Sequence, residues 1–335
     1  MNLVKYSKRN STIELLRMFF MLGIVFLHAF YHGSNGNIEW IYSLGKDNST
    51  AYQLSLYSLS RIGVTGFMFI SGYYGIKMNA QRIYKFLSMV IFYFIVVAVL
   101  CSQGFGGIIK GVIHAWDAWW FVASYFMICI LSPILNAGLD RLSQRDFLYV
   151  VLGILTYTYL GHFIVGLDSH DTELLLSIYI IARYVRKRFT SPPISKRKLL
   201  CVSVFSIAIL CFAPIIIMKC WGNIHIVDIL ICNNSPLVLL ASSSLVLLLD
   251  SISFHSRLIN WMASSTFAVY LLTDNGLRSK IDSWILNNIL DVDIYGYLLM
   301  LLVFIVCIII DKMRGVIFLP IDKKINKWIL KKFYR

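Results

Sequence analysis

The chain consists of long apolar runs separated by short polar segments. A helix that spans a bilayer needs about 20 mostly apolar residues, fewer where neighbouring helices shield it. Ten runs meet this requirement: Ile13–Tyr31, Leu54–Tyr74, Phe86–Ser102, Trp119–Ala137, Phe147–Phe163, Leu174–Tyr184, Leu199–Met218, Pro236–Leu249, Trp261–Thr273 and Tyr295–Ile310. The sixth and the ninth are the shortest. The pattern predicts an all-α integral membrane protein with ten transmembrane helices.

The composition agrees with a membrane protein and excludes a soluble globular protein and a nucleic-acid-binding protein. Of the 335 residues, 58% are apolar or aromatic and 14% are charged, whereas ordinary soluble domains are about a quarter charged. A net charge of +14 would suit a nucleic-acid partner, but the chain has too little polar surface to keep the remaining apolar residues in water. We therefore expect the basic side chains to interact with the lipid bilayer, and we expect no nucleic-acid partner.

The distribution of basic residues predicts an orientation. Loops that face the cytoplasm carry an excess of Lys and Arg. With the N-terminus placed inside, 24 of the 31 basic residues fall in cytoplasmic segments and 5 in external loops, while Arg17 and Arg61 lie within spans. If a helix in the middle of the chain were missed or wrongly added, every later loop would change sides and this asymmetry would be lost. The sequence therefore predicts a multi-pass protein with both termini in the cytoplasm.

No long hydrophilic stretch separates a second domain, so residues 1–335 are predicted to form a single membrane domain, with a helical bundle over about 13–311. The segment of about 312–335 is rich in lysine with interleaved apolar residues. This pattern is typical of an amphipathic helix that lies on an anionic membrane surface. We expect it to anchor the chain rather than to take part in chemistry.

The first apolar run carries ionisable residues that are costly inside a membrane and point to function. Arg17 and His28 are eleven residues apart, which is three helical turns plus about 20°, so they share one side of the helix at about 16 Å along its axis. His32 follows one turn later on the same face. Taken singly, Arg17 could extend to the inner headgroups, and His28 could be a hydrogen-bonded packing residue. As an aligned pair they favour chemistry: a histidine can deprotonate a hydroxyl, and a guanidinium can bind phosphate or polarise a carbonyl.

Six stretches resemble, in order, those of the membrane acyltransferase family 3. In the first, the Arg of IELLRMFFMLGIVFLH (Ile13–His28) is followed after ten residues by a His. The others are GVTGFMFISGYY (Gly63–Tyr74), QRIYKF (Gln81–Phe86), WWFVASYFMICILSPILN (Trp119–Asn136), NNSPLVLLASSS and SSTFAVYLLTDN. The last two are similar to the bacterial polysaccharide O-acetyltransferase branch. The resemblance extends from about Ile13 to Asp311.

The resemblance implies an O-acyltransferase of the bacterial inner membrane that moves an acyl group, usually acetyl, from acyl-CoA to a hydroxyl of a capsular, exopolysaccharide or other cell-surface sugar. Acetyl-CoA would be a donor substrate, with no cofactor bound, and a sugar or glycan the acceptor. Carried over by position, His28 would be the catalytic base and Arg17 its helix partner. Arg82 and Lys85 would meet the phosphates of coenzyme A, and Tyr73 and Trp120 would line the acyl or sugar path.

The chain departs from the family pattern in the predicted ninth helix. Thr273 stands where the pattern usually has a His, and it is followed by Asp274 and Asn275. These two residues could orient an imidazole or bind sugar hydroxyls, or simply end a helix. Glu39, in the first external loop, is a second candidate carboxylate for His28.

Two other functions are consistent with the sequence. A transporter or flippase for a glycan intermediate would have paired broken helices and carboxylates at the midplane, but the only acidic residue well inside an early span is Glu14. A non-catalytic membrane partner in polysaccharide assembly is compatible with Thr273. We expect no metal site, because His28 and His32 have no evident third ligand. The oligomeric state stays open.

Overall fold

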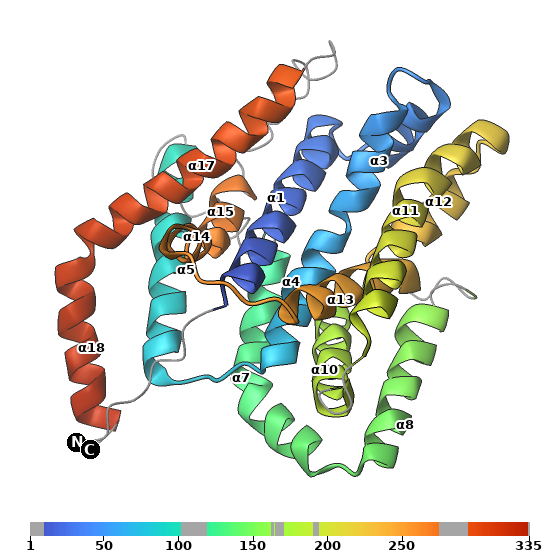
Figure 1. Cartoon of the computed structure of the whole chain (residues 1–335). Helices are drawn as coiled ribbons and strands as arrows, with labels where there is room; N and C mark the ends of the chain where they lie inside the picture. The colour runs from blue at the N-terminus through green and yellow to red at the C-terminus, as the bar shows by residue number, and fades with distance from the viewer. Residues whose placement is uncertain are drawn as a thin grey trace.

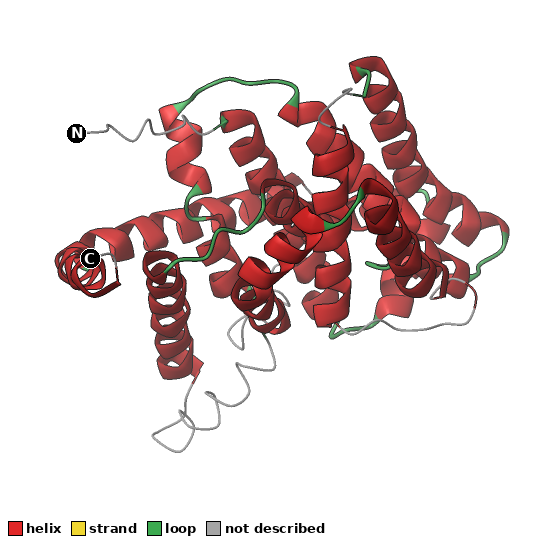
Figure 2. Cartoon of the chain, turned by 90° about the horizontal axis from the view of Figure 1, so that it is seen from below, coloured by secondary structure: helices red, strands yellow, loops and turns green. Residues whose placement is uncertain are grey.

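The computed structural model describes residues 10–101, 119–161, 164, 171–189, 194–274 and 294–333. Over these residues the chain is helical, and it contains no strand (Figure 1, Figure 2). The α-helices are α1 (Ser11–Gly33), α2 (Ile38–Ser43), α3 (Ala51–Ser60), α4 (Ile62–Tyr74), α5 (Ala80–Cys101), α7 (Trp120–Arg141), α8 (Gln144–Ile154), α10 (Asp171–Phe189), α11 (Lys196–Cys220), α12 (Ile224–Ile231), α13 (Pro236–Asp250), α14 (Arg257–Ala263), α15 (Thr266–Thr273), α17 (Ile294–Ile317) and α18 (Leu319–Phe333). A 3-10 turn, η1 (Leu44–Lys46), follows α2, and a π-helical segment, η2 (Leu155–Leu160), extends α8. The predicted all-α class is confirmed.

Within the described residues, six helical segments are long and apolar enough to cross a membrane. They are Ser11–Gly33, Ala51–Tyr74, Ala80–Val99, Trp120–Arg141, Lys196–Cys220 and Ile224–Asp250. The remaining predicted spans also contain helix, namely α8 with η2, α10, α14 with α15, and α17. A multi-pass membrane protein is therefore supported, whereas the number ten and the cytoplasmic placement of both termini stay predictions.

Two predicted spans are not single straight helices. The second is divided into α3 and α4 at Arg61, whose Nη2 donates to the hydroxyl of Tyr57 at 2.8 Å. The ninth is divided into α14 and α15 at Ser264 and Ser265, and the Ser265 hydroxyl donates to Asp311 of α17 at 2.6 Å. The contact of Arg61 is local, four residues back in the chain, whereas that of Ser265 is tertiary, and apolar periodicity reveals neither.

Helix α4 lies at the centre of the bundle and packs against α1, α10 and α13 (Figure 1). Two of its glycines allow this close approach. A Cβ at Gly63 would lie 2.7 Å from the carbonyl oxygen of Phe20 in α1, and a Cβ at Gly72 would lie 2.7 Å from that of Tyr179 in α10. Both separations are shorter than atoms tolerate, so glycine sets the distance between these helices.

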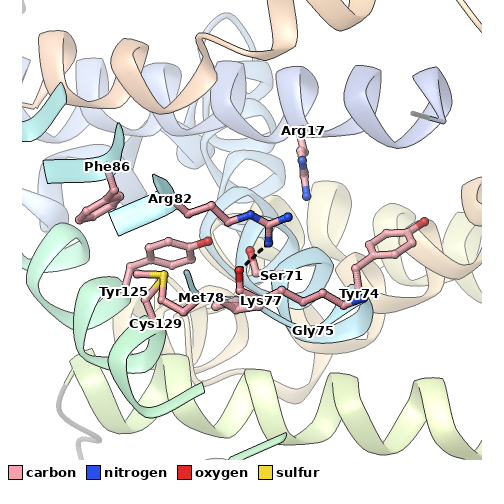
Figure 3. A pocket seen from close by; sticks show the side chains of 11 residues that line it. Arg17, Ser71, Tyr74, Gly75, Lys77, Met78, Arg82, Phe86, Tyr125 and Cys129 are labelled. Carbon is pink, nitrogen blue, oxygen red and sulfur yellow. Dashed lines mark hydrogen bonds between the residues drawn. The ribbon is translucent and has the colours of Figure 1, made fainter. Parts of the chain in front are cut away.

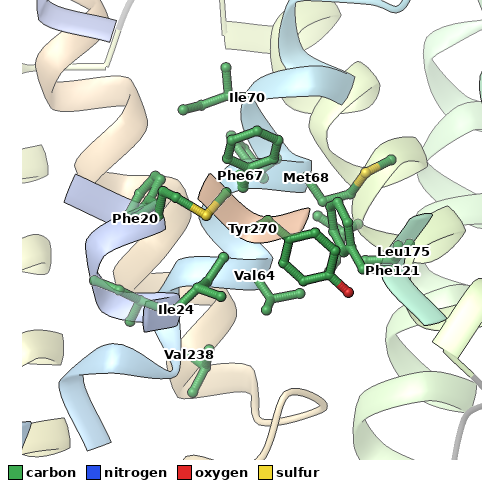
Figure 4. Packing of buried hydrophobic residues seen from close by; sticks show 14 of the residues in the cluster. Phe20, Ile24, Val64, Phe67, Met68, Ile70, Phe121, Leu175, Val238 and Tyr270 are labelled. Carbon is green, nitrogen blue, oxygen red and sulfur yellow. The ribbon is translucent and has the colours of Figure 1, made fainter. Parts of the chain in front are cut away.

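The buried core extends along α4 and continues onto α7 and α15 (Figure 4). Phe67 of α4 packs edge-to-face on Phe121 of α7, with ring centroids 6.1 Å apart, and Phe121 packs in turn on Tyr270 of α15 at 5.6 Å. Large apolar side chains on the outer faces of the bundle, such as Phe205 and Phe212 of α11, are exposed. Such an outer surface suits a hydrocarbon environment.

The helical bundle has two polar ends, and different side-chain contacts distinguish one end from the other. Tyr74 at the end of α4 hydrogen-bonds Asp250 at the end of α13 at 2.5 Å, and Arg183 of α10 pairs with Asp140 of α7 at 2.6 Å. We call this the Arg17 end, because Arg17 lies beside Tyr74. The opposite end, where α1 and α15 finish, is the His28 end.

The C-terminal segment forms the predicted amphipathic helix, α18. Tyr84 of α5 donates to Asp322 at 2.7 Å, and Ile329 is buried. Lys323, Lys324 and Lys327 are exposed. Helix α18 therefore contacts α5 near its start, at the Arg17 end, while these lysines and the apolar side chains of Ile321, Trp328 and Leu330 are exposed.

Candidate active site

A cavity of about 270 Å³ opens at the Arg17 end of the bundle. Its lining comes from α1, the end of α4, the turn after α4, the start of α5 and α7 (Figure 3). The lining residues are Arg17, Ser71, Tyr74, Gly75, Ile76, Lys77, Met78, Arg82, Phe86, Tyr125 and Cys129. The cavity thus combines a polar, cationic rim with aromatic and apolar walls.

The local backbone structure explains why basic side chains lie together at this cavity. Gly75 has a φ of 72°, a left-handed conformation that glycine adopts at little cost, and it turns the chain from α4 towards α5. Asn79 then accepts the backbone N–H of Arg82 at 2.9 Å, which caps the start of α5. The Arg82 guanidinium in turn donates to the carbonyl of Lys77 at 2.5 Å. This turn therefore places Lys77 and Arg82 at the same mouth.

The charge of the cavity is strongly positive. Arg17, Lys77 and Arg82 line it, and the described residues of its lining include no Asp or Glu. Figure 3 shows Arg17 and Arg82 directed towards the same space from two different helices, α1 and α5. Glu14 pairs with Arg17 at 3.2 Å, one turn nearer the start of α1, and offsets part of this charge. Guanidinium groups match the geometry of phosphate, and the start of a helix adds a positive dipole, so the cavity suits a phosphorylated ligand.

At the other end of α1, two histidines share one buried carboxylate. His28 Nε2 lies 3.9 Å from Oδ2 of Asp274, and His32 Nε2 lies 4.0 Å from Oδ1 of the same residue. The His28 side chain is 11% exposed and that of Asp274 8%, whereas that of His32 is 34% exposed. His28 Nδ1 is buried and has no hydrogen-bond partner among the described residues. This arrangement provides a buried imidazole beside a carboxylate, as a general base requires.

Asp274 is held at this place by the residues around it. It follows the last residue of α15, and its backbone N–H donates to Tyr270 at 2.9 Å. Its backbone carbonyl accepts a hydrogen bond from the indole Nε1 of Trp119, at the start of α7. The Thr273 hydroxyl donates to the carbonyl of Val269 at 2.8 Å. The hydroxyl that replaces the histidine of the family pattern is therefore bonded to its own helix, not to His28.

Aromatic rings connect the two ends. Tyr125, which lines the cationic cavity, stacks on Phe121 with centroids 5.7 Å apart, and Phe121 contacts Tyr270 at 5.6 Å. The Tyr270 ring lies 6.1 Å from that of His28. We call Tyr125, Phe121 and Tyr270 the aromatic row. Since the row touches the surroundings of both Arg17 and His28, these two residues face the same side of α1, as their spacing predicts.

The structure distributes the predicted site residues unevenly. It brings together His28, His32 and Asp274 at one end, and Arg17 and Arg82 at the other. Asn275 lies outside the described residues. Lys85 is exposed on α5 and is not part of the cavity lining. Glu39 is exposed on α2, whereas the carboxylate beside His28 belongs to Asp274.

Tyr73 and Trp120, the predicted path residues, also occupy other places. Tyr73 donates to Asp250 at 3.0 Å and lies under the guanidinium of Arg186, in a separate cavity of about 200 Å³. Trp120 is half-buried and packs edge-to-face on Phe121. The row between the two ends consists instead of Tyr125, Phe121 and Tyr270.

Sequence reasoning missed Lys77, Trp119 and Tyr125 as site residues. A signal existed for Lys77, because it lies in the same basic segment between two apolar runs as Arg82 and soon after Gly75. Trp119 and Tyr125 lie in the WWFVASYF stretch, but their roles depend on contacts with Asp274 and Phe121 that only the fold reveals.

Comparison with known proteins gives one match. A family model described as an acyltransferase domain matches residues 10–312, a range that contains Arg17, Arg82, His28 and Asp274. Searches of curated proteins and of solved structures found no significant similarity. The match covers most of the chain and includes both ends of the site, so the chain belongs to acyltransferase family 3 and is a membrane acyltransferase.

Proposed function

We propose that this protein is an O-acyltransferase of the bacterial inner membrane, which moves an acyl group, with acetyl as the expected one, from cytoplasmic acyl-CoA to a hydroxyl of a capsular, exopolysaccharide or other cell-surface sugar. One observation carries this proposal. Helix α1 presents Arg17 to a cationic cavity at one end and His28 to a buried carboxylate at the other. A donor site and a base are thereby fixed to one rigid element.

The cationic cavity is the donor site of this proposal. Coenzyme A carries several phosphate charges, and Arg17, Lys77 and Arg82 supply positive charge to a lining whose described residues include no carboxylate. Lys85, further along α5, is exposed and is available to attract the donor to the mouth rather than to hold it. The charge asymmetry of the sequence supports a cytoplasmic location for this end, which a cytoplasmic acyl-CoA donor requires.

In this proposal, the aromatic row is the path along which the acyl group of the donor reaches His28. Arg17 and His28 are about 16 Å apart along α1 by helix geometry. The thin, extended pantetheine arm of coenzyme A would pass along Tyr125, Phe121 and Tyr270, whose ring faces suit a flexible, weakly polar chain. The thioester would then reach His28 while the phosphates stay at the cavity.

The reaction needs one proton to move twice. His28 takes the proton of the acceptor hydroxyl as the oxygen attacks the thioester carbonyl, and the C–O bond forms. The carbon–sulfur bond breaks, and the coenzyme A thiolate receives the proton from the His28 imidazolium. Asp274 stabilises the imidazolium between these steps, because it lies 3.9 Å from the ring.

The decisive experiment compares surface glycan from cells that produce the native protein, His28→Ala or His225→Ala, with O-linked acyl groups measured by NMR or mass spectrometry. His225 is an exposed histidine of α12 and serves as the matched control. We expect O-acylation with the native protein and with His225→Ala, and its loss with His28→Ala at equal protein levels. Persistent acylation in His28→Ala would reject the base assignment.

Deletion of the whole protein separates the enzyme from the alternatives. An enzyme leaves the glycan on the surface and removes only its O-acyl groups. Loss of the surface glycan itself would support transport or assembly instead. An unchanged O-acyl content after deletion would reject acylation of that glycan.

A further inference from the structure

The two ring nitrogens of His28 lie in different surroundings. Nε2 faces Oδ2 of Asp274 at 3.9 Å, while Nδ1 is buried with no hydrogen-bond partner among the described residues. A neutral imidazole carries one N–H, and an ionised carboxylate only accepts hydrogen bonds. The proton of neutral His28 is therefore favoured on Nε2, which leaves the lone pair on Nδ1.

We infer that Asp274 fixes this tautomer, so that Nδ1 of His28 is the atom that takes the proton from the acceptor hydroxyl. The inference rests on the proposed function and adds the reacting atom to it. Buried polar atoms are nearly always hydrogen-bonded in native proteins, and a substrate hydroxyl would supply the partner that Nδ1 lacks. A distance of 3.9 Å is longer than a hydrogen bond, and catalytic contacts commonly shorten when substrate binds.

Asp274 and His32 are positioning residues in this scheme. Each carboxylate oxygen of Asp274 faces a different imidazole, Oδ2 towards His28 and Oδ1 towards His32. The rings of His28 and His32 lie edge-to-face with centroids 6.0 Å apart. His32 thus lies beside the second carboxylate oxygen, and the Trp119 indole donates a hydrogen bond to the backbone carbonyl of Asp274. The substrate proton moves to Nδ1 and leaves from Nδ1 to the thiolate, while Nε2–H stays directed at Asp274.

The first test is Asp274→Asn in the full-length protein. An amide presents an N–H donor to Nε2, which favours the opposite tautomer with the proton on Nδ1. We expect kcat to fall about 10²- to 10⁴-fold, and KM for acyl-CoA to change less than about 3-fold, because the cationic cavity is at the other end of α1. Asp274→Glu should recover part of kcat, since it restores an acceptor. Asp47→Asn, at an exposed loop carboxylate, is the control with native kcat.

The second test observes the tautomer without any turnover. The full-length protein, with its seven histidines labelled with ¹⁵N in the ring, is measured by NMR in nanodiscs, and the signals of His28 are assigned by their loss in His28→Gln. We expect Nδ1 of native His28 to show the shift of an unprotonated nitrogen, and Asp274→Asn to reverse the two nitrogens.

A native His28 that carries its proton on Nδ1, or an Asp274→Asn variant with native kcat, would overturn the inference. A native protein that transfers no acyl group would instead reject the proposed function, and the NMR measurement would still decide the tautomer. The two failures are therefore distinguishable.

Discussion

At the scale of single residues, the two ends of α1 depend on different chemistry. Arg17 and Arg82 supply charge that is directed into an open cavity, and the role that we propose for them is electrostatic. His28 depends on its surroundings, because its buried ring lies beside Asp274 and its Nδ1 has no hydrogen-bond partner within the part of the chain that the structure describes. Substitutions at the two ends should therefore change different kinetic constants.

Arg82→Ala tests the donor end. The substitution removes one of the three cations of the cavity, and charge-assisted hydrogen bonds contribute about 1.5–3 kcal/mol each. We expect KM for acyl-CoA to rise about 10- to 100-fold, with kcat at saturating donor nearly unchanged. Steady-state kinetics in nanodiscs measure both. Arg145→Ala, at an exposed arginine of α8, should leave KM at its native value, and an equal rise in this control would show a general surface effect.

Thr273→Val tests whether the threonine hydroxyl takes part in chemistry. This hydroxyl donates to the Val269 carbonyl within α15, and valine keeps its shape. We expect activity within about 3-fold of native, because such local hydrogen bonds add little. A loss comparable to that of His28→Ala would instead place the hydroxyl in the reaction.

At the scale of elements, sequence reasoning succeeded where geometry is local. The shared face of Arg17 and His28 follows from 100° per residue, and the structure places both towards the aromatic row. Sequence reasoning was incomplete where a contact between residues far apart in the chain determines the arrangement of the site. The carboxylate beside His28 comes from the end of α15, far along the chain, and Ser265, at the break between α14 and α15, bonds to Asp311 of α17.

Gly72→Ala tests the close approach of α4 and α10. The added Cβ would lie 2.7 Å from the Tyr179 carbonyl oxygen, so one helix must move. We expect the free energy of unfolding to fall by about 1–3 kcal/mol, measured as a lower thermal midpoint in detergent. Gly138→Ala in α7 is the matched control, because a Cβ there meets nothing within 4 Å and alanine favours a helix. A midpoint of Gly72→Ala at or above native would contradict this view of the packing.

At the scale of the whole molecule, the contacts organise the helices between two polar ends. Tyr74, Arg82 and Asp250 lie at the Arg17 end, while His32, Trp119 and Asp274 lie at the His28 end. This arrangement agrees with an asymmetric protein that handles one substrate on each side of a membrane. The sidedness itself comes from the basic residues of the sequence.

Cysteine labelling tests this sidedness. In a variant without the seven native cysteines, Ser49→Cys and Gln144→Cys each introduce one thiol at an exposed position, before α3 and at the start of α8 respectively. We expect a membrane-impermeant maleimide to label Ser49→Cys in intact spheroplasts, and Gln144→Cys only after permeabilisation. The reverse pattern would invert the predicted topology and move the cationic cavity to the outside.

The aromatic row has a consequence for the ion gradient of the membrane. A protein that binds polar ligands at both ends risks a continuous water-filled passage, through which protons would leak. Phe121 and Tyr270 are buried, and their rings pack between the cationic cavity and His28. Among the described residues, these contacting rings form an apolar segment between the two ends, so we expect the side chains that would guide a donor arm also to limit proton leakage when none is present.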